Sequence, residues 1–187
     1  MENDMALSGE MTASAFDALL RDGKLAGSWT LDPSRSKISL RSKSMWGLVA
    51  VKGVFGQVEG HGTVSAAGAA SGTITVASAS IDTKMKKRDE HLRSADFFDV
   101  ANHPGITFTA AEVRPSGQGV TVTGSLKVRG YERPVSFDAQ VASSDGSEVW
   151  LDGEVQINRG DFGLTWNQLG MSSMDNTVTL HAVFTRQ

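Results

Sequence analysis

The stretch that decides the fold runs from residue 135 to residue 157 and reads VSFDAQVASSDGSEVWLDGEVQI. In its first part, 135–141, and again in its last part, 149–157, apolar residues recur at alternate positions. Successive side chains of a strand point to opposite faces, so this pattern is typical of strands with one buried and one wet face. Asp145-Gly146 lies between the two parts, and Asp-Gly is a favoured hairpin turn. The stretch therefore predicts an antiparallel hairpin.

The same alternation recurs on both sides of this hairpin. It is seen at 37–41, 73–76, 106–109, 120–128 and 178–184. Turn pairs separate these segments at Ala67-Gly68, Ser116-Gly117 and Arg129-Gly130. With an early strand near 28–31 and another near 48–60, we expect eight or nine strands. A sheet of that size tends to curl and close, so the sequence predicts a mainly β protein built on a closed antiparallel barrel of about eight strands.

Ten apolar side chains share the strand faces expected to point into the barrel. They are Ile38, Leu40, Ile74, Val76, Phe108, Val122, Leu126, Phe137, Leu151 and Leu180. A barrel of this size either fills with side chains or holds one small ligand, and the pattern alone favours the filled core. Gly124, Ala139 and Gly153 lie on or beside these faces, where they mark bulges or leave room for a ligand tail.

Two segments depart from the strand pattern. Residues 1–27 form an expected N-terminal arm with a short amphipathic helix, capped by Thr12 and ending near Gly23. This helix would cover a barrel mouth, dock on a second subunit, or fray. The barrel domain is expected over 28–187, interrupted by an inserted helix at about 83–94 with Asp82 as its N-cap.

Composition excludes several classes of function. The net charge is −3 and the isoelectric point about 5.8, which does not favour a nucleic acid partner. The chain has no cysteine, so disulfides and thiolate chemistry are excluded. Glu2 and Asp4 stand where a signal peptide would be basic, and no apolar run approaches the roughly 20 residues of a membrane span. We expect a soluble, cytoplasmic protein.

Eight short motifs follow one another along the chain. The central ones are SIDT at 80–83, RDEHLRS at 88–94, DFFDV at 96–100 and PGITF at 104–108. Four more are WTLDP at 29–33, VKGVF at 51–55, GSLKVRG at 124–130 and NRGDFG at 158–163. From Trp29 to about Phe184, the sequence closely resembles the YceI-like family. The resemblance implies an elongated, lipocalin-like barrel with an apolar tunnel for polyisoprenoids or other long-chain lipids, and frequently a homodimer.

This chain departs from the family pattern in two respects. Many relatives carry a secretory signal, whereas the N-terminal arm of this sequence is expected to be non-secretory. Many also have a histidine after the second strand, where this sequence reads RSKSMW at 41–46. No role of that histidine carries over to this chain.

Because of this resemblance, we predict that the ten interior side chains bind the ligand. Trp46 and Trp166, in loops near the barrel ends, are added to the predicted ligand-binding residues. Such loop side chains form an adaptable apolar gate or, more often, only pad the barrel end. Four cations near the start of the inserted helix form a predicted electropositive rim for an acidic head group: Lys84, Lys86, Lys87 and Arg88. The alternative is a solvated helix face with intrahelical ion pairs.

Catalytic and metal sites are not predicted. Arg88, Asp89 and His91 suggest acid–base chemistry, but residues two apart on a helix diverge. Asp89 and Arg159 are instead expected to anchor a helix and a strand end. The four histidines, His61, His91, His103 and His181, have no metal-ligand spacing, and His181 should point outward. We expect no enzyme activity and no cofactor.

The sequence thus predicts a protein that carries or stores a polyisoprenoid, an isoprenoid quinone or a similar lipid. Two alternatives stay open. One is a small enzyme that acts on such a lipid. The other is an interaction module with a filled core, in which the N-terminal helix and Trp150, on the wet face of its strand, form the contact surface.

Overall fold

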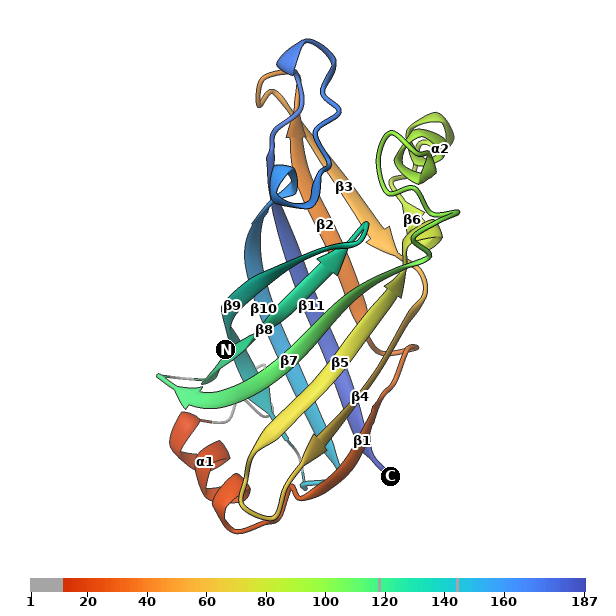
Figure 1. Cartoon of the computed structure of the whole chain (residues 1–187). Coiled ribbons are helices and arrows are strands. Elements are labelled where there is room, and N and C mark those ends of the chain that lie inside the picture. The colour runs from red at the N-terminus through yellow and green to blue at the C-terminus, as the bar shows by residue number, and fades with distance from the viewer. Residues whose placement is uncertain (1–11, 118, 144) are drawn as a thin grey trace, which may run out of the picture.

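The computed structural model describes residues 12–117, 119–143 and 145–187. Within them, eleven strands form one antiparallel sheet, accompanied by the helices α1 (Ala13–Arg21) and α2 (Lys86–Arg93) (Figure 1). The strands are β1 (Gly27–Leu31), β2 (Lys37–Ser44), β3 (Val49–Phe55), β4 (Val58–Val64), β5 (Ala70–Ala77), β6 (Ile81–Asp82), β7 (Gly105–Ser116), β8 (Gly119–Val128), β9 (Tyr131–Ala142), β10 (Glu148–Asn158) and β11 (Asp175–Arg186).

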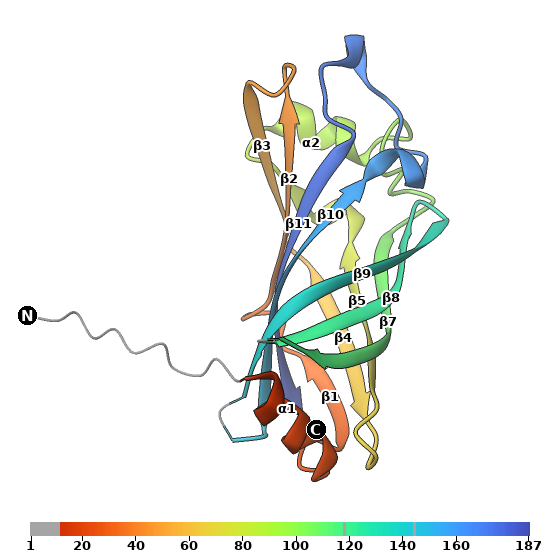
Figure 2. The same ribbon diagram turned by 90° about the vertical axis from the view of Figure 1, so that its left-hand side faces the viewer.

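Eight of these strands close into a barrel, in the order β1-β4-β5-β7-β8-β9-β10-β11 and back to β1. The predicted closed barrel of about eight strands is confirmed. The long strand β11 pairs with β1 through 184–186 and with β2 through 177–181. Strands β2, β3 and β6 therefore extend the sheet beyond the barrel at the end that carries α2 (Figures 1 and 2).

The described residues form eleven strands, so the expected total of eight or nine was wrong: the segment 48–60 is two strands, and Ile81–Asp82 adds the short strand β6. Gly56 and Gln57 interrupt the segment 48–60, and the Gly56 amide donates to Ser80 O at 3.1 Å. Before this break β3 pairs with β2, and after it β4 pairs with β1 and β5. The break moves the chain from the sheet extension into the barrel wall.

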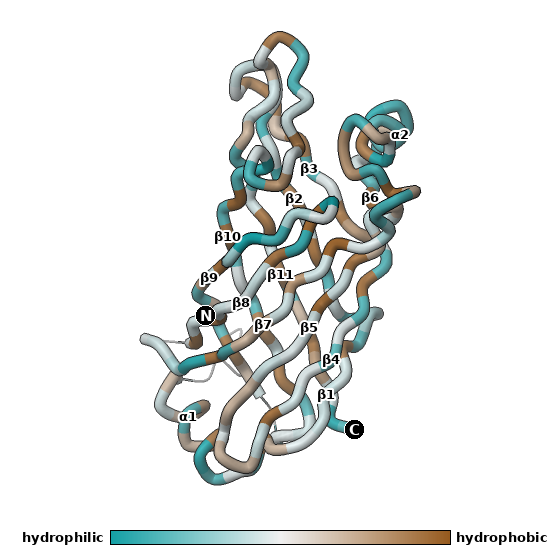
Figure 3. Tube along the Cα trace, in the orientation of Figure 1, coloured by the Kyte–Doolittle hydropathy of each residue, from teal (hydrophilic) through white to brown (hydrophobic). Residues whose placement is uncertain are grey.

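Hydrophobic and more hydrophilic residues alternate along the strands (Figure 3), and burial follows this alternation. Val122, Ala139 and Val141 are buried, whereas the neighbouring positions Thr123 and Gln140 are exposed. Two clusters of apolar side chains line opposite ends of the barrel, one near α2 and one near α1. The hydrophobic effect on these inward faces is the main force that holds the barrel together.

Helix α1 lies across one end of the barrel (Figure 2). The Thr12 side chain caps it by accepting a hydrogen bond from the Ala15 amide at 3.2 Å, as the sequence predicts. Phe16 and Leu20 are buried in the same apolar cluster as Leu25. Within this chain α1 packs on the end of the barrel, against β7, β8 and β9, and docking on a second subunit stays a prediction.

Helix α2 is shorter than predicted, and its predicted N-cap is wrong. The helix begins at Lys86, after Met85, with no side-chain cap. The Asp82 carboxylate instead accepts from the Lys84 amide at 2.8 Å, and Lys84 has a left-handed φ of 63°. The chain therefore turns sharply at Lys84 before the helix can start.

The buried Asp89 anchors α2, as predicted from the sequence. Its Oδ1 accepts from the Thr83 amide at 2.9 Å and from the Thr83 hydroxyl at 2.5 Å. Arg88 donates to the other side of Thr83, to its hydroxyl and its carbonyl. These bonds supply the fixed helix start that Asp82 does not.

Two interior glycines have different roles. A Cβ on Gly124 would lie 2.0 Å from Thr109 O, next to the register shift between β7 and β8. This glycine marks a bulge, one of the two roles considered. A Cβ on Gly153 would lie 3.0 Å from the Phe137 ring. This second glycine makes room for an aromatic side chain inside the barrel.

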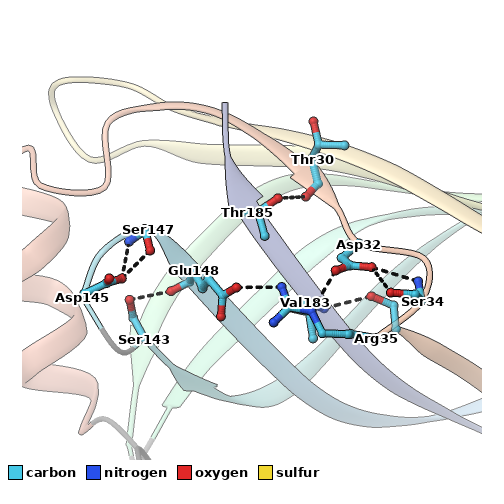
Figure 4. Close-up of polar contacts among 11 residues, drawn as sticks. Thr30, Asp32, Ser34, Arg35, Ser143, Asp145, Ser147, Glu148, Val183 and Thr185 are labelled. Atoms are coloured by element: carbon cyan, nitrogen blue, oxygen red, sulfur yellow. Dashed lines mark hydrogen bonds and ion pairs between the residues drawn. The ribbon is translucent and has the colours of Figure 1, made fainter.

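A polar network ties the loop after β1 to the outer wall where the barrel closes (Figure 4). Asp32 accepts from the Ser34 amide at 2.9 Å and hydroxyl at 2.6 Å, and from Arg35 Nε at 2.8 Å. Arg35 also donates to Glu148 on β10 at 2.7 Å. The hydrogen bonds from Ser34 and then Arg35 lower the pKa of Asp32 to about 2.

Candidate ligand-binding chambers

The barrel interior is not filled: it holds two apolar cavities. The α2-side chamber, which includes Phe97 and Phe98 from the segment after α2, has a volume of about 160 Å³. The α1-side chamber, which includes Phe16 of α1, has a volume of about 120 Å³. Both are larger than a water molecule requires, yet their linings are almost entirely hydrophobic. Such spaces suit an apolar guest better than water.

Four residues line both chambers, so the chambers are neighbours: Ile74, Phe108, Phe137 and Leu180. The rings of Phe108 and Phe137 pack against each other with centroids 5.6 Å apart and an interplanar angle of 56°. This aromatic pair stands at the junction. A single chain that occupied both chambers would have to pass it.

All ten predicted interior side chains line at least one chamber. Eight line the α2-side chamber: Ile38, Leu40, Ile74, Val76, Phe108, Leu126, Phe137 and Leu180. The other two, Val122 and Leu151, line the α1-side chamber. The period of two therefore identified the inward face of each strand correctly.

Trp46 and Trp166 line neither chamber. Trp46 lies in the tight turn between β2 and β3 and is 68% exposed. Trp166 is 41% exposed and stacks on His91, with ring centroids 4.2 Å apart. Both belong to loops, where composition gives no information on side-chain direction, and their role as gates stays a prediction.

Several chamber residues from loops, strand ends, helix α1 and strand β1 were not predicted. They include Phe97, Phe98, Phe162 and Leu164, with the polar residues Arg159 and Asn176, in the α2-side chamber, and Phe16 of α1 and Trp29 of β1 in the α1-side chamber. Phe97 and Phe98 lie in the DFFDV motif of the family resemblance. The periodicity of a strand cannot report on segments that close a barrel end.

The four cations of the predicted rim do not line a chamber. Lys84 Nζ lies 2.6 Å from Asp82, a pairing that raises the pKa of Lys84. Lys86 lies 3.9 Å from Glu90, Lys87 is exposed, and Arg88 is bound to Thr83. This arrangement matches the alternative of a solvated face with local pairs, and an attraction for acidic head groups stays a prediction.

Arg159 anchors the end of β10, as predicted, and is buried in the wall of the α2-side chamber. Its Nε donates to Ser173 O at 3.0 Å, and its Nη1 donates to Leu164 O at 2.5 Å and Trp166 O at 2.9 Å. Its guanidinium also lies 5.5 Å from the Phe97 ring centroid. Burial lowers the pKa of Arg159.

In the part of the chain that the structure describes, the candidate acid–base residues do not share a partner. Asp89 binds Thr83, whereas the His91 ring packs against Trp166 at an interplanar angle of 57°. His181 Nδ1 lies 2.6 Å from Asp152 on the wet face of the neighbouring strand, which confirms its outward direction. Over the described residues, no three His, Cys, Asp or Glu side chains form a metal-binding group.

Comparison with known proteins gives one family. The model of the YceI-like domain matches residues 29–185, nearly the whole barrel. The chain belongs to the YceI-like family. A UPF0312 protein of Pectobacterium atrosepticum is 35% identical over 120 residues, and Protein YceI of Salmonella arizonae is 34% identical over 108. These alignments cover 61% and 54% of this chain, and 62% and 56% of the relatives.

Solved structures share the YceI-like barrel. BcnA of Burkholderia cenocepacia superposes with a TM-score of 0.74 at 26% identity, covering 82% of this chain and 98% of BcnA. A polyisoprenoid-binding domain from Saccharophagus degradans, implicated in plant cell wall breakdown, superposes with a TM-score of 0.68 at 16% identity. That match covers 85% of this chain and 98% of the domain, and it shows the shared fold.

No helix among the described residues is long and apolar enough to cross a membrane.

Proposed function

We propose that this YceI-like protein binds, and carries or stores, a long-chain apolar molecule such as a polyisoprenoid or an isoprenoid quinone. The observation that carries the proposal is the lining of the α2-side chamber, in which Arg159 and Asn176 are the only polar side chains. The membership of the YceI-like family and the polyisoprenoid-binding domain with the same fold support this class of ligand. A binding role needs no catalytic group.

The volumes of the chambers limit the part of the ligand that fits inside. An apolar cavity of about 150 Å³ holds a benzene-sized molecule. The two chambers together therefore accommodate a chain on the order of ten carbons. At about 0.8 kcal/mol per buried CH₂, such a chain gains about 8 kcal/mol before the costs of association. A longer tail would have to extend through an end of the barrel.

The test is to extract the ligand from the protein purified from cells that make it. The protein is denatured, and the organic extract is analysed by mass spectrometry. We expect a long-chain species at a stoichiometry near one. An empty extract from folded protein would overturn the proposal.

A pair of variants distinguishes the interior from the surface. Leu180 lines both chambers, and the preceding residue of β11, Thr179, is exposed on the other face. Leu180→Trp should fill the junction and abolish ligand recovery, whereas Thr179→Trp should leave ligand recovery unchanged. Equal recovery from both folded variants would place the ligand outside the barrel.

Two further expectations stay predictions. A homodimer is tested by sedimentation at several concentrations, with Trp150, half-buried on the outer side of β10, as the first contact to mutate. A cytoplasmic location is tested by fractionation of the source cells. Neither outcome changes the ligand that the chambers would hold.

A further inference from the structure

A buried cation in the α2-side chamber has one donor group without a partner. Arg159 is only 5% exposed, and Nε and Nη1 donate to three carbonyl oxygens. Its Nη2 is buried and has no hydrogen-bond partner. Leaving such a donor unsatisfied is costly, so a polar group left in this state commonly has a function.

The charge of Arg159 is also uncompensated. No ion pair joins it to a carboxylate in the described part of the chain; its neighbours are carbonyl dipoles and the Phe97 ring. A buried charge that lacks a counter-charge favours the approach of an anion or of a strongly polarised oxygen. Arginine is suited to this because its fork can bind one partner while other donors hold it in place.

Arg159, which carries this donor, is one of the residues that line the α2-side chamber. Arg159 follows β10 and Asn176 lies at the start of β11, so the two polar side chains of the lining come from neighbouring strand ends. Asn176 Nδ2 is already used, because it donates to Met174 O at 2.9 Å. Of these two lining residues, Arg159 therefore keeps a buried donor, Nη2, without a partner.

A second unsatisfied group lies at the same end. His91 Nε2 is the other buried side-chain atom without a partner among the described residues. His91 packs near the Phe97 ring, with centroids 6.4 Å apart, and the same ring faces the Arg159 guanidinium. Both buried side-chain nitrogen atoms that lack a hydrogen-bond partner among the described residues, Arg159 Nη2 and His91 Nε2, therefore lie at the α2 end of the barrel.

We infer that Arg159 Nη2 is a head-group subsite, which donates a hydrogen bond to an acceptor oxygen at one end of the bound chain. The inference rests on the proposed function and deepens it. The ligand class becomes an amphiphile whose head carries such an oxygen, either a neutral carbonyl or an anionic carboxylate or phosphate. The head lies at the α2 end, and the chain runs toward the Phe108–Phe137 junction.

The test uses three probes of eleven carbons each, measured by displacement of an apolar fluorescent dye. Undecane has no acceptor, undecan-2-one has a neutral acceptor, and undecanoate has an anionic one. Each is titrated into the wild-type protein and into Arg159→Met. We expect Arg159→Met to weaken the ketone or the carboxylate by about 10- to 100-fold, or about 1.4–2.8 kcal/mol, and undecane by less than about twofold.

Comparison of the undecan-2-one and undecanoate titrations distinguishes a neutral from an anionic acceptor oxygen. A loss confined to undecanoate assigns an anionic head, and a loss for both oxygen-bearing probes includes a neutral carbonyl. An equal change for all three probes would overturn the subsite, because Arg159 would then act only on the shape of the chamber. If no probe binds the wild-type protein, undecane included, the proposed function itself fails.

If Arg159→Met does not fold, a measurement on the wild-type protein tests the same hydrogen bond. The side-chain nitrogen resonances of Arg159 are followed by NMR as each probe is added. We expect the Nη signals to shift with an oxygen-bearing probe and to stay in place with undecane. Signals that respond identically to all three probes would refute a hydrogen bond to the head group.

Discussion

The Phe108–Phe137 pair at the junction of the chambers gives the sharpest prediction on the interior. Phe→Ala in a core costs about 3–5 kcal/mol, and an aromatic pair adds about 0.5–1.5 kcal/mol to the burial of its rings. Phe137 lines both chambers, so its ring already borders empty space and has fewer contacts to lose. We therefore expect Phe137→Ala to lower the free energy of unfolding by about 3 kcal/mol, at the lower end of the range.

The same substitution should improve the binding of a long chain. Loss of the ring joins the two chambers, so a straight alkyl chain no longer has to pass between Phe108 and Phe137. A ligand at 100 times its Kd stabilises the folded state by about 2.7 kcal/mol, which would restore most of the loss. Without ligand, the melting temperature should fall by about 6–12 °C.

Urea unfolding with and without a long-chain ligand measures both effects. The control is Gln140→Ala on the exposed face of β9, which should change the free energy of unfolding by less than about 0.5 kcal/mol. A double-mutant cycle with Phe108→Ala should give a coupling of about 0.5–1.5 kcal/mol. The reasoning is refuted if Phe137→Ala is as stable as the wild type, or if the ligand stabilises both proteins equally.

Three further substitutions test the structure around the chambers. Asp89→Ala removes the acceptor of two buried Thr83 donors and should cost about 3 kcal/mol in urea unfolding, whereas Ala at the exposed Glu90 should cost less than about 0.5 kcal/mol. Gly124→Ala would place a Cβ 2.0 Å from Thr109 O and should cost at least about 2 kcal/mol, whereas Gly56→Ala, whose Cβ would lie 3.7 Å from Ser80 O, should be tolerated. Asp32 has its pKa lowered from 3.8 to about 2, so the stability that it contributes is complete above pH 3.8 and is lost as the pH falls toward 2. Asp32→Asn should remove this part of the acid unfolding transition, which is measured by tryptophan fluorescence as a function of pH. If the variant unfolds over the same pH range as the wild type, the Ser34 and Arg35 contacts do not couple to folding.

The strand faces were predictable from the sequence because a period of two depends only on local backbone geometry. This is why all ten interior side chains were assigned correctly, and why closure at about eight strands followed. The break at Gly56 and the start of α2 were not predictable in the same way. Each depends on contacts with segments distant in sequence or on a turn conformation, as with the bond to Ser80 and the left-handed Lys84.

Whether the barrel is filled or hollow lies beyond the reach of periodicity. Alternation reports which side chains point inward, but the space left between them depends on how the eight strands face one another. Gly153 illustrates the difficulty: it lines the α2-side chamber, but the Phe137 ring lies 3.0 Å from the position that its Cβ would take. The family resemblance favoured a tunnel, and the structure shows two chambers that an aromatic pair separates.

Arg159 shows how one residue can serve both the fold and the ligand. As a strand-end anchor it needs only Nε and Nη1, which already bind the carbonyls of 164, 166 and 173. An anchor alone could be placed with its spare donor in solvent, where water would satisfy Nη2. The fold instead buries that donor in the wall of an apolar chamber. Apolar walls hold a chain without fixing its position along the barrel, so a single directed hydrogen bond at one end is what would set the register of the ligand.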